Sequence, residues 1–191
     1  MNIKQQQILN AAFTLFYKRG FHAIGINEII KKANVAKKTL YHHFPSKNEL
    51  IIATLELHHW QIMQILEQSI EHSVPGKDCI LAIFEQISAW IEGKTEELPT
   101  FNGCYFNQAY SEFSVIDPDI TAACLSNKKA FKNIIQKQVD NFENDADKNK
   151  LLVDLLILLK EGALANATIF TENSSAQQAI HYIENILRFK R

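Results

Sequence analysis

Residues 26–50 have the sequence INEIIKKANVAKKTLYHHFPSKNEL, and this stretch decides the fold at the start of the chain. Apolar residues between Ile26 and Ala33 recur at three- and four-residue steps, which predicts a short helix with one buried face. Asn34 suits the turn that follows, because asparagine is one of the few residues besides glycine that adopt positive φ. A second short helix is expected from Lys37 to His43. Two short helices joined by a tight turn predict a helix-turn-helix.

The flanking residues add one helix before this motif and a longer helix after it. The first helix is expected to end at Gly20, and its buried face is formed by Ile8, Leu9, Ala12, Phe13 and Phe16. Ser46 and Glu49 have the spacing of a capping box, which predicts that a long helix begins at Lys47 and continues to about His72.

The rest of the chain has the same helical periodicity. We expect further helices over residues 77–92, 103–113, 119–142, 148–170 and 175–189. The sequence has no strand-like alternation of any length. It therefore predicts an all-α protein of about nine helices, with a three-helix head over residues 1–46 and a larger helical domain over residues 47–191.

Charge is distributed unevenly along the chain. Residues 1–48 hold eight Lys or Arg and one acid, a formal balance of +7, whereas the remainder holds 12 bases and 20 acids, a balance of −8. A basic head on an acidic body favours binding to a polyanion, because Lys and Arg replace the counterions condensed on phosphates. A solvated basic face explains the same distribution equally well.

Several other classes of protein are disfavoured by what the sequence lacks. It has no P-loop, GxGxxG, HExxH or GxSxG motif, so we expect neither an enzyme nor a cofactor. Cys79, Cys104 and Cys124 are scattered and odd in number, which disfavours a disulfide scaffold or a zinc site. The first ten residues lack the pattern of a secretory signal, and no apolar run is long enough to span a bilayer. We therefore expect a cytoplasmic location.

The second short helix of the motif carries side chains suited to the major groove. That groove admits one α-helix, whose N-terminal residues contact the edges of the bases. Lys37 and Lys38 stand at this end and can reach guanine or phosphate, and Thr39 can hydrogen-bond to a base. Leu40 and Phe44 are expected to face inward.

Three further residues are candidates for phosphate contacts, which fix the position of a protein on DNA without reading its sequence: Tyr41, His43 and Lys47. Two interpretations without DNA contact remain open. Tyr41 can instead pack on the first helix, and His42 and His43 can be ordinary surface residues.

The run from Thr39 to Leu50, TLYHHFPSKNEL, resembles the most diagnostic part of the DNA-binding domain of the TetR/AcrR family of bacterial repressors. Gly20-Phe21-His22-Ala23 and Ala33-Asn34-Val35 extend the resemblance over about the first quarter of the chain. The resemblance implies a homodimer that releases a palindromic operator when a small molecule enters the C-terminal domain. It also implies base contacts from Lys37, Lys38, Thr39 and His42, and phosphate contacts from Tyr41, His43 and Lys47.

Four positions depart from the family pattern. Asn34 stands in the turn where the family usually has Gly, an exchange that the turn tolerates. Gly25 stands where the family often has Ser or Thr at the start of the second helix. We keep this position in the predicted DNA surface, although glycine offers no hydroxyl to a phosphate. Ala36 replaces a Ser that commonly caps the recognition helix, and Lys38 replaces a common Gly. These differences put the operator sequence in doubt rather than DNA binding.

The two C-terminal helices are the predicted partner surface. The span 148–170 is apolar nearly all round between Leu151 and Leu159, so it needs cover on more than one side. The span 175–189 carries an apolar stripe made of Ala176, Ala179, Ile180, Ile183, Ile186 and Leu187. Two such helix pairs related by a two-fold axis make a four-helix homodimer interface. The alternative is that these faces are buried within one chain.

Aromatic and sulfur-containing residues gather in the middle of the chain and can line an apolar ligand pocket with a few polar anchors. The predicted lining is Trp60, Met63, Phe84, Trp90, Cys104, Phe106, Asn107 and Tyr110. Core packing explains most of these residues individually. We favour a buried structural role for Cys104 over a thiol sensor, because no Lys or Arg lies within several residues to lower its pKa.

These features predict a ligand-responsive, sequence-specific repressor that releases its operator when a small molecule or a thiol modification alters the C-terminal domain. One alternative is a repressor that is constitutive or controlled by another protein, without a small-molecule inducer. Activation instead of repression also remains open.

Overall fold

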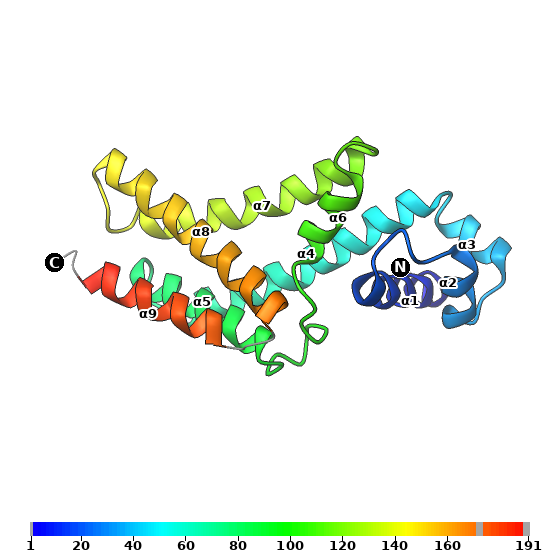
Figure 1. Ribbon diagram of the computed structural model, residues 1–191, viewed down its shortest axis with the longest axis horizontal. Coiled ribbons are helices and arrows are strands. Elements are labelled where there is room, and N and C mark those ends of the chain that lie inside the picture. The colour runs from blue at the N-terminus through cyan, green and yellow to red at the C-terminus, as the bar shows by residue number, and fades with distance from the viewer. Residues whose placement is uncertain (1, 171–173, 189–191) are drawn as a thin grey trace. The chain divides into compact units, whose positions relative to one another are not determined.

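The computed structural model describes residues 2–170 and 174–188, and over these ranges the chain forms nine α-helices and no strand (Figure 1). The helices are α1 (Ile3–Arg19), α2 (Ile26–Ala33), α3 (Lys37–His43), α4 (Lys47–Glu71), α5 (Lys77–Ile91), α6 (Tyr105–Phe113), α7 (Pro118–Val139), α8 (Ala146–Phe170) and α9 (Ser174–Arg188). The predicted all-α class is confirmed. Among the described helices, none is long and apolar enough to cross a membrane.

Helix ends lie within three residues of the predicted positions, and aspartate caps explain two of the differences. α7 begins at Pro118 because Asp117 Oδ1 accepts the backbone N–H groups two and three residues later, at 3.0 and 2.9 Å. α8 begins at Ala146 because Asp145 Oδ1 makes the same two bonds, at 3.1 and 3.0 Å. Pro118 occupies the first helical position, where its missing N–H has no partner to lose.

The chain divides into two compact units, and α4 and α7 contribute residues to both. Unit 1 comprises residues 1–60 and 104–127, and unit 2 comprises residues 61–103 and 128–191. The predicted boundary between residues 1–46 and 47–191 is a functional division, and it stays a prediction.

Unit 1 contains a three-helix head in which α1 packs against α2 and α3. The buried face of α1 is the predicted one, since all of its five residues are buried: Ile8, Leu9, Ala12, Phe13 and Phe16. Gly20 caps the C-terminus of α1, as expected, and the Gly20 N–H donates to Phe16 O at 2.8 Å. Gly20 has a φ of 85° and a ψ of 163°, a region that is essentially restricted to glycine.

α6 supplies the residue around which unit 1 packs. The Tyr105 ring is fully buried, with its centroid 4.9 Å from that of Phe21, 5.1 Å from Phe13 and 5.5 Å from Tyr17. Its hydroxyl shares a hydrogen bond of 2.8 Å with Thr54 Oγ1 of α4. Burial raises the pKa of Tyr105 well above its usual value, so the phenol stays neutral. The core of unit 1 therefore joins the head to α4 and α6.

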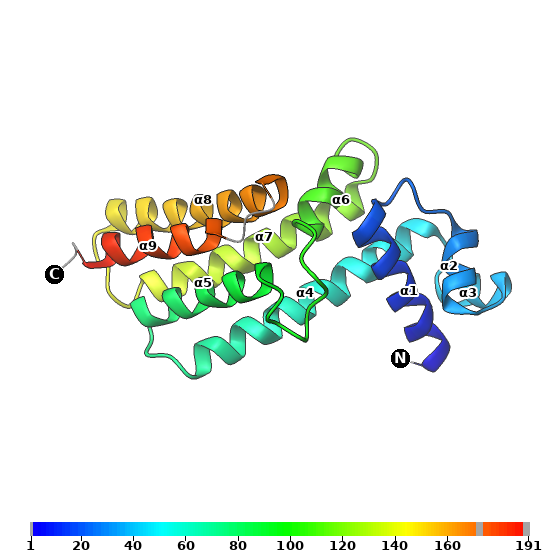
Figure 2. The same ribbon diagram turned by 60° about the horizontal axis from the view of Figure 1, so that its bottom comes forward.

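Unit 2 is built on α5, α8 and α9, and α9 lies along both α5 and α8 (Figure 2). The apolar stripe of α9 that was predicted for the partner surface is instead buried within this single unit. Ala176, Ala179, Ile180, Ile183 and Leu187 are buried, and Ile186 is half-buried. The expectation for this stripe was wrong, because α5 and α8 of the same chain cover it.

Candidate DNA interface

Residues 34–36 form the turn of the helix-turn-helix. Asn34 adopts the left-handed conformation that its residue type predicted, with a φ of 52° and a ψ of 51°. The Asn34 N–H donates to Lys31 O at 3.3 Å, and the Val35 N–H donates to Ile30 O at 3.1 Å. These bonds cap the C-terminus of α2, so that α3 can start in a new direction at Lys37.

α3 carries six of the residues predicted to contact DNA, and it presents most of them to solvent. The exposed residues are Lys37, Lys38, Tyr41 and His42, and the half-buried ones are Thr39 and His43. Leu40 and Phe44 are buried, as predicted. Tyr41 keeps 41% of its surface exposed, so its ring is not part of the core. α3 therefore has an apolar inner side and a polar outer side.

Contacts along α3 bring its cationic and aromatic groups together. Lys37 Nζ lies 6.0 Å from the centroid of the Tyr41 ring, at the outer limit of a cation–π contact. The rings of His42 and His43 meet edge to face with centroids 5.0 Å apart. The major groove of B-DNA admits one α-helix, so α3, with hydrogen-bond donors on its exposed side, can enter it.

Two predicted DNA residues lie outside α3. Lys47 is half-buried, and its Nζ donates to Phe21 O at 2.7 Å. Burial lowers the pKa of Lys47 below its ordinary value, and the charge of Glu112 opposes this effect. A phosphate contact therefore requires Lys47 to exchange or share its bond to Phe21. Gly25 precedes α2 in an extended conformation with open space at its Cβ position, so the fold does not require glycine there.

The predicted pocket residues are divided between the two units. Trp60, Cys104, Phe106, Asn107 and Tyr110 belong to unit 1, whereas Met63, Phe84 and Trp90 belong to unit 2. Phe84, Trp90 and Phe106 are buried, whereas Trp60, Asn107 and Tyr110 are exposed. The pocket therefore stays a prediction. Among the described residues, no cluster of three or more His, Cys, Asp or Glu is arranged to hold a metal ion.

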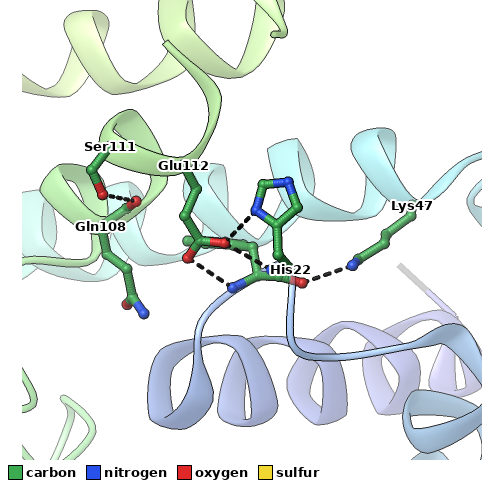
Figure 3. Close-up of polar contacts among 6 residues, drawn as sticks. His22, Lys47, Gln108, Ser111 and Glu112 are labelled. Carbon is green, nitrogen blue, oxygen red and sulfur yellow. Dashed lines mark hydrogen bonds and ion pairs between the residues drawn. The ribbon is translucent and has the colours of Figure 1, made fainter. Parts of the chain in front are cut away.

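One residue next to the head was missed by sequence reasoning, because no motif or periodicity singles it out. The Glu112 carboxylate of α6 accepts the backbone N–H groups of Phe21 and His22, which belong to the loop between α1 and α2, at 3.0 and 2.7 Å (Figure 3). Partial burial alone would raise the pKa of Glu112, but these bonds and His22 outweigh it and lower the pKa below its ordinary value. Glu112 is therefore ionised beside the helix-turn-helix.

A three-helix head whose third helix exposes lysine, threonine, tyrosine and histidine defines a helix-turn-helix DNA-binding protein. The model of the tetR family of bacterial regulatory proteins matches residues 8–54. A solved TetR-family transcriptional regulator from Streptomyces coelicolor is 25% identical, with a TM-score of 0.87, and the match covers 97% of this chain and 94% of that one.

Two regulators from other bacteria are also similar. The HTH-type transcriptional repressor NemR of Escherichia coli is 24% identical over 192 residues, which cover 96% of this chain and 93% of NemR. The reduced form of NemR has the same fold, with a TM-score of 0.78 at 23% identity over 96% of each chain. The HTH-type transcriptional activator FasR of Mycolicibacterium smegmatis is 35% identical, but over 47% of this chain and 41% of its own length.

Residues 8–54 thus form a DNA-binding domain of the TetR type, and the chain as a whole has the fold of TetR-family helix-turn-helix transcriptional regulators. Like these relatives, it is a DNA-binding regulator rather than an enzyme.

The missing cap of α3 generates a prediction about stability. Ala36 has the extended conformation of an N-cap residue but no side chain that can accept a hydrogen bond. In Ala36→Ser, the hydroxyl can accept the backbone N–H of Lys38, so we expect the free energy of unfolding to rise by about 1 kcal/mol. Urea denaturation measures the change. Ala122→Ser, an exposed exchange inside α7, is the control and is expected to bring no gain. Equal effects of the two exchanges would contradict the cap account.

Proposed function

We propose that the chain is a homodimeric, cytoplasmic repressor that binds a palindromic operator through α3 and releases it when a signal alters its C-terminal part. The observation that carries the proposal is the exposed set of cationic and hydrogen-bonding side chains on α3, opposite the buried Leu40. We assign DNA binding to residues 1–46, and dimerisation and ligand binding to residues 47–191.

The side chains of the head have distinct chemical roles in this proposal. Base contacts are made from the N-terminal part of α3, by Lys37, Lys38, Thr39 and His42. Phosphate contacts fix the orientation of the head and are made by Tyr41, His43 and Lys47, and Gly25 belongs to the same proposed DNA surface. The Lys47 ammonium has three N–H donors, so it can keep its bond to Phe21 O and also donate to a phosphate oxygen on binding.

An exposed apolar seam on α8 supports a dimer through the 148–170 region. Its members alternate at four- and three-residue steps: Leu151, Leu155, Leu158, Gly162, Ala165 and Ile169. Leu151, Leu158 and Ile169 are each about 70% exposed in the single chain. Leucine and isoleucine repeated on this period, with small residues between them, are typical of a helix–helix interface. A two-fold dimer places two recognition helices on the two halves of a palindrome.

Repression is favoured over activation by the extent of the similarities. The similarity to NemR, a repressor, covers nearly the whole chain, including the C-terminal helices. The similarity to FasR, an activator, covers less than half of either protein. A repressor without a small-molecule inducer, either constitutive or controlled by another protein, is the alternative.

Two kinds of signal are proposed for release of the operator. The first is a small molecule bound by the predicted pocket residues: Trp60, Met63, Phe84, Trp90, Cys104, Phe106, Asn107 and Tyr110. The second is modification of Cys104, which is half-exposed at the N-cap of α6, whereas Cys79 and Cys124 are buried. NemR has been solved in a reduced form, which supports testing a thiol signal.

Operator selection from random duplex DNA tests DNA binding. We expect a palindrome to be enriched, with an affinity that falls steeply as the salt concentration rises. Lys37→Ala and Lys38→Ala are each expected to weaken operator binding by about 1–3 kcal/mol, because each removes a base or phosphate contact. Lys129→Ala removes an exposed charge from α7 in unit 2 and serves as the control. No enriched sequence, or equal losses in all three variants, would contradict the proposal.

Sedimentation equilibrium tests the seam on α8. Leu158→Glu is expected to raise the dimer dissociation constant roughly 100-fold, because each protomer would bury an unpaired carboxylate. Val115→Glu is the matched control, since Val115 is an exposed apolar residue of the α6–α7 turn outside the seam. A Leu158→Glu protein that remains as dimeric as the control would place the interface elsewhere.

Alkylation separates the two signals. If Cys104 is the sensor, treatment with N-ethylmaleimide abolishes operator binding by the wild type but not by Cys104→Ser. If the signal is a small molecule alone, the alkylated wild type keeps its affinity, and a compound screen with the selected operator finds the inducer. We expect the second result, because Cys104 has no Lys or Arg near it in the sequence to favour the thiolate.

A further inference from the structure

The loop between α1 and α2 is held in place by α6 rather than by the head alone. Glu112 Oε1 accepts the Phe21 N–H at 3.0 Å, and Glu112 Oε2 accepts the His22 N–H at 2.7 Å. His22 Nδ1 lies 2.7 Å from the same Oε2 atom (Figure 3). One carboxylate therefore engages two consecutive backbone donors and one side chain of this loop.

The same loop is held from its other side by α4. Lys47 Nζ donates to Phe21 O at 2.7 Å, and the Phe21 side chain is fully buried between the rings of Phe16, Tyr105 and Phe113. The His22 ring stacks on Phe113 with centroids 4.8 Å apart and an angle of 18° between their planes. Both the backbone and the side chain of Phe21 are thus fixed from outside α1 to α3.

Gly20 makes this arrangement possible. A Cβ atom at residue 20 would lie 3.1 Å from Glu112 Oε1, and the φ of 85° already disfavours any other residue. Phe21 O also receives the Ile24 N–H at 3.4 Å, and Ile24 is buried one residue before the N-cap of α2. A displacement of Phe21 therefore reaches the start of the helix-turn-helix within a few residues.

We propose that Glu112 is a positioning residue for DNA binding, which sets the placement of the helix-turn-helix by holding residues 20–22. In this role it passes changes in α6 to the recognition helix by a direct route through the α1–α2 loop. The inference rests on the proposed DNA-binding function. α6 is suited to this role because Cys104 is its N-cap and Asn107 and Tyr110 lie on it, and all three are among the residues proposed to receive the signal.

Operator binding by Glu112→Gln tests this role. The amide keeps the size of the side chain but loses the charge and one of the two acceptor oxygens. We expect operator affinity to fall about 10-fold, within the range of typical coupling between sites. The dependence of affinity on salt should keep its slope, because the phosphate contacts are unchanged. Ser111→Ala, on the same helix, contacts Gln108 rather than the loop and should bind like the wild type.

A second variant separates positioning from a loss of folding. His22→Ala removes only the side-chain bond to Glu112 and the stacking on Phe113, and we expect a smaller loss of affinity. In the double variant the two losses should not add, because both remove the same contact. All affinities are taken per active molecule, from stoichiometric titration with the selected operator, so that unfolded protein does not count.

The outcomes distinguish this inference from the function on which it rests. If the wild type selects no operator, the proposed function fails and the role of Glu112 fails with it. If the wild type binds its operator, and Glu112→Gln binds equally well, only the positioning role is overturned. Fully additive losses in Glu112→Gln and His22→Ala would also overturn it, because the two residues would then act independently.

Discussion

The buried ring of Tyr105 is the contact on which the rest of unit 1 depends. It lies against Phe13, Tyr17 and Phe21 of the head, and its hydroxyl is satisfied by Thr54 of α4. A three-helix segment of fewer than about 50 residues is small for an independent core, so it gains from apolar partners outside itself. An aromatic residue of this size, with its polar end paired, supplies such a partner at one point. Packing against Tyr105 of α6 therefore stabilises the three-helix head.

The position of α3 follows from this constraint. Leu40 and Phe44 fix its inner side in the core, and the left-handed Asn34 sets the angle at which it leaves α2. Because the inner side of α3 packs in the core, its other side faces solvent. That side carries Lys37, Lys38, Tyr41 and His42. The polar contacts of Glu112 lie beside the same aromatic cluster, so the loop that leads into α2 is fixed both by packing and by charge.

Local features of the sequence predicted much of this fold, whereas long-range contacts were beyond it. Asn34, Gly20 and Ser46 have residue types that suit their turns and caps, and Ser46 Oγ does accept the Glu49 N–H at 3.1 Å. The apolar stripe of α9 was recognisable, but periodicity does not say which helix covers a stripe, and α5 and α8 of the same chain do so. Glu112 and Phe21 are 91 residues apart, so no local pattern could connect them. The dependence of the head on Tyr105 escaped prediction for the same reason.

Native-state hydrogen exchange in rising urea tests most directly whether the head and α6 form one cooperative body. The amides of Phe16 in α1, Leu50 in α4 and Ala109 in α6 are all buried in unit 1. The account predicts that they exchange through one common opening, with the same free energy and the same dependence on urea. If Phe16 opened at a clearly lower free energy while Ala109 stayed protected, the head would be an independent domain, and the account would be contradicted.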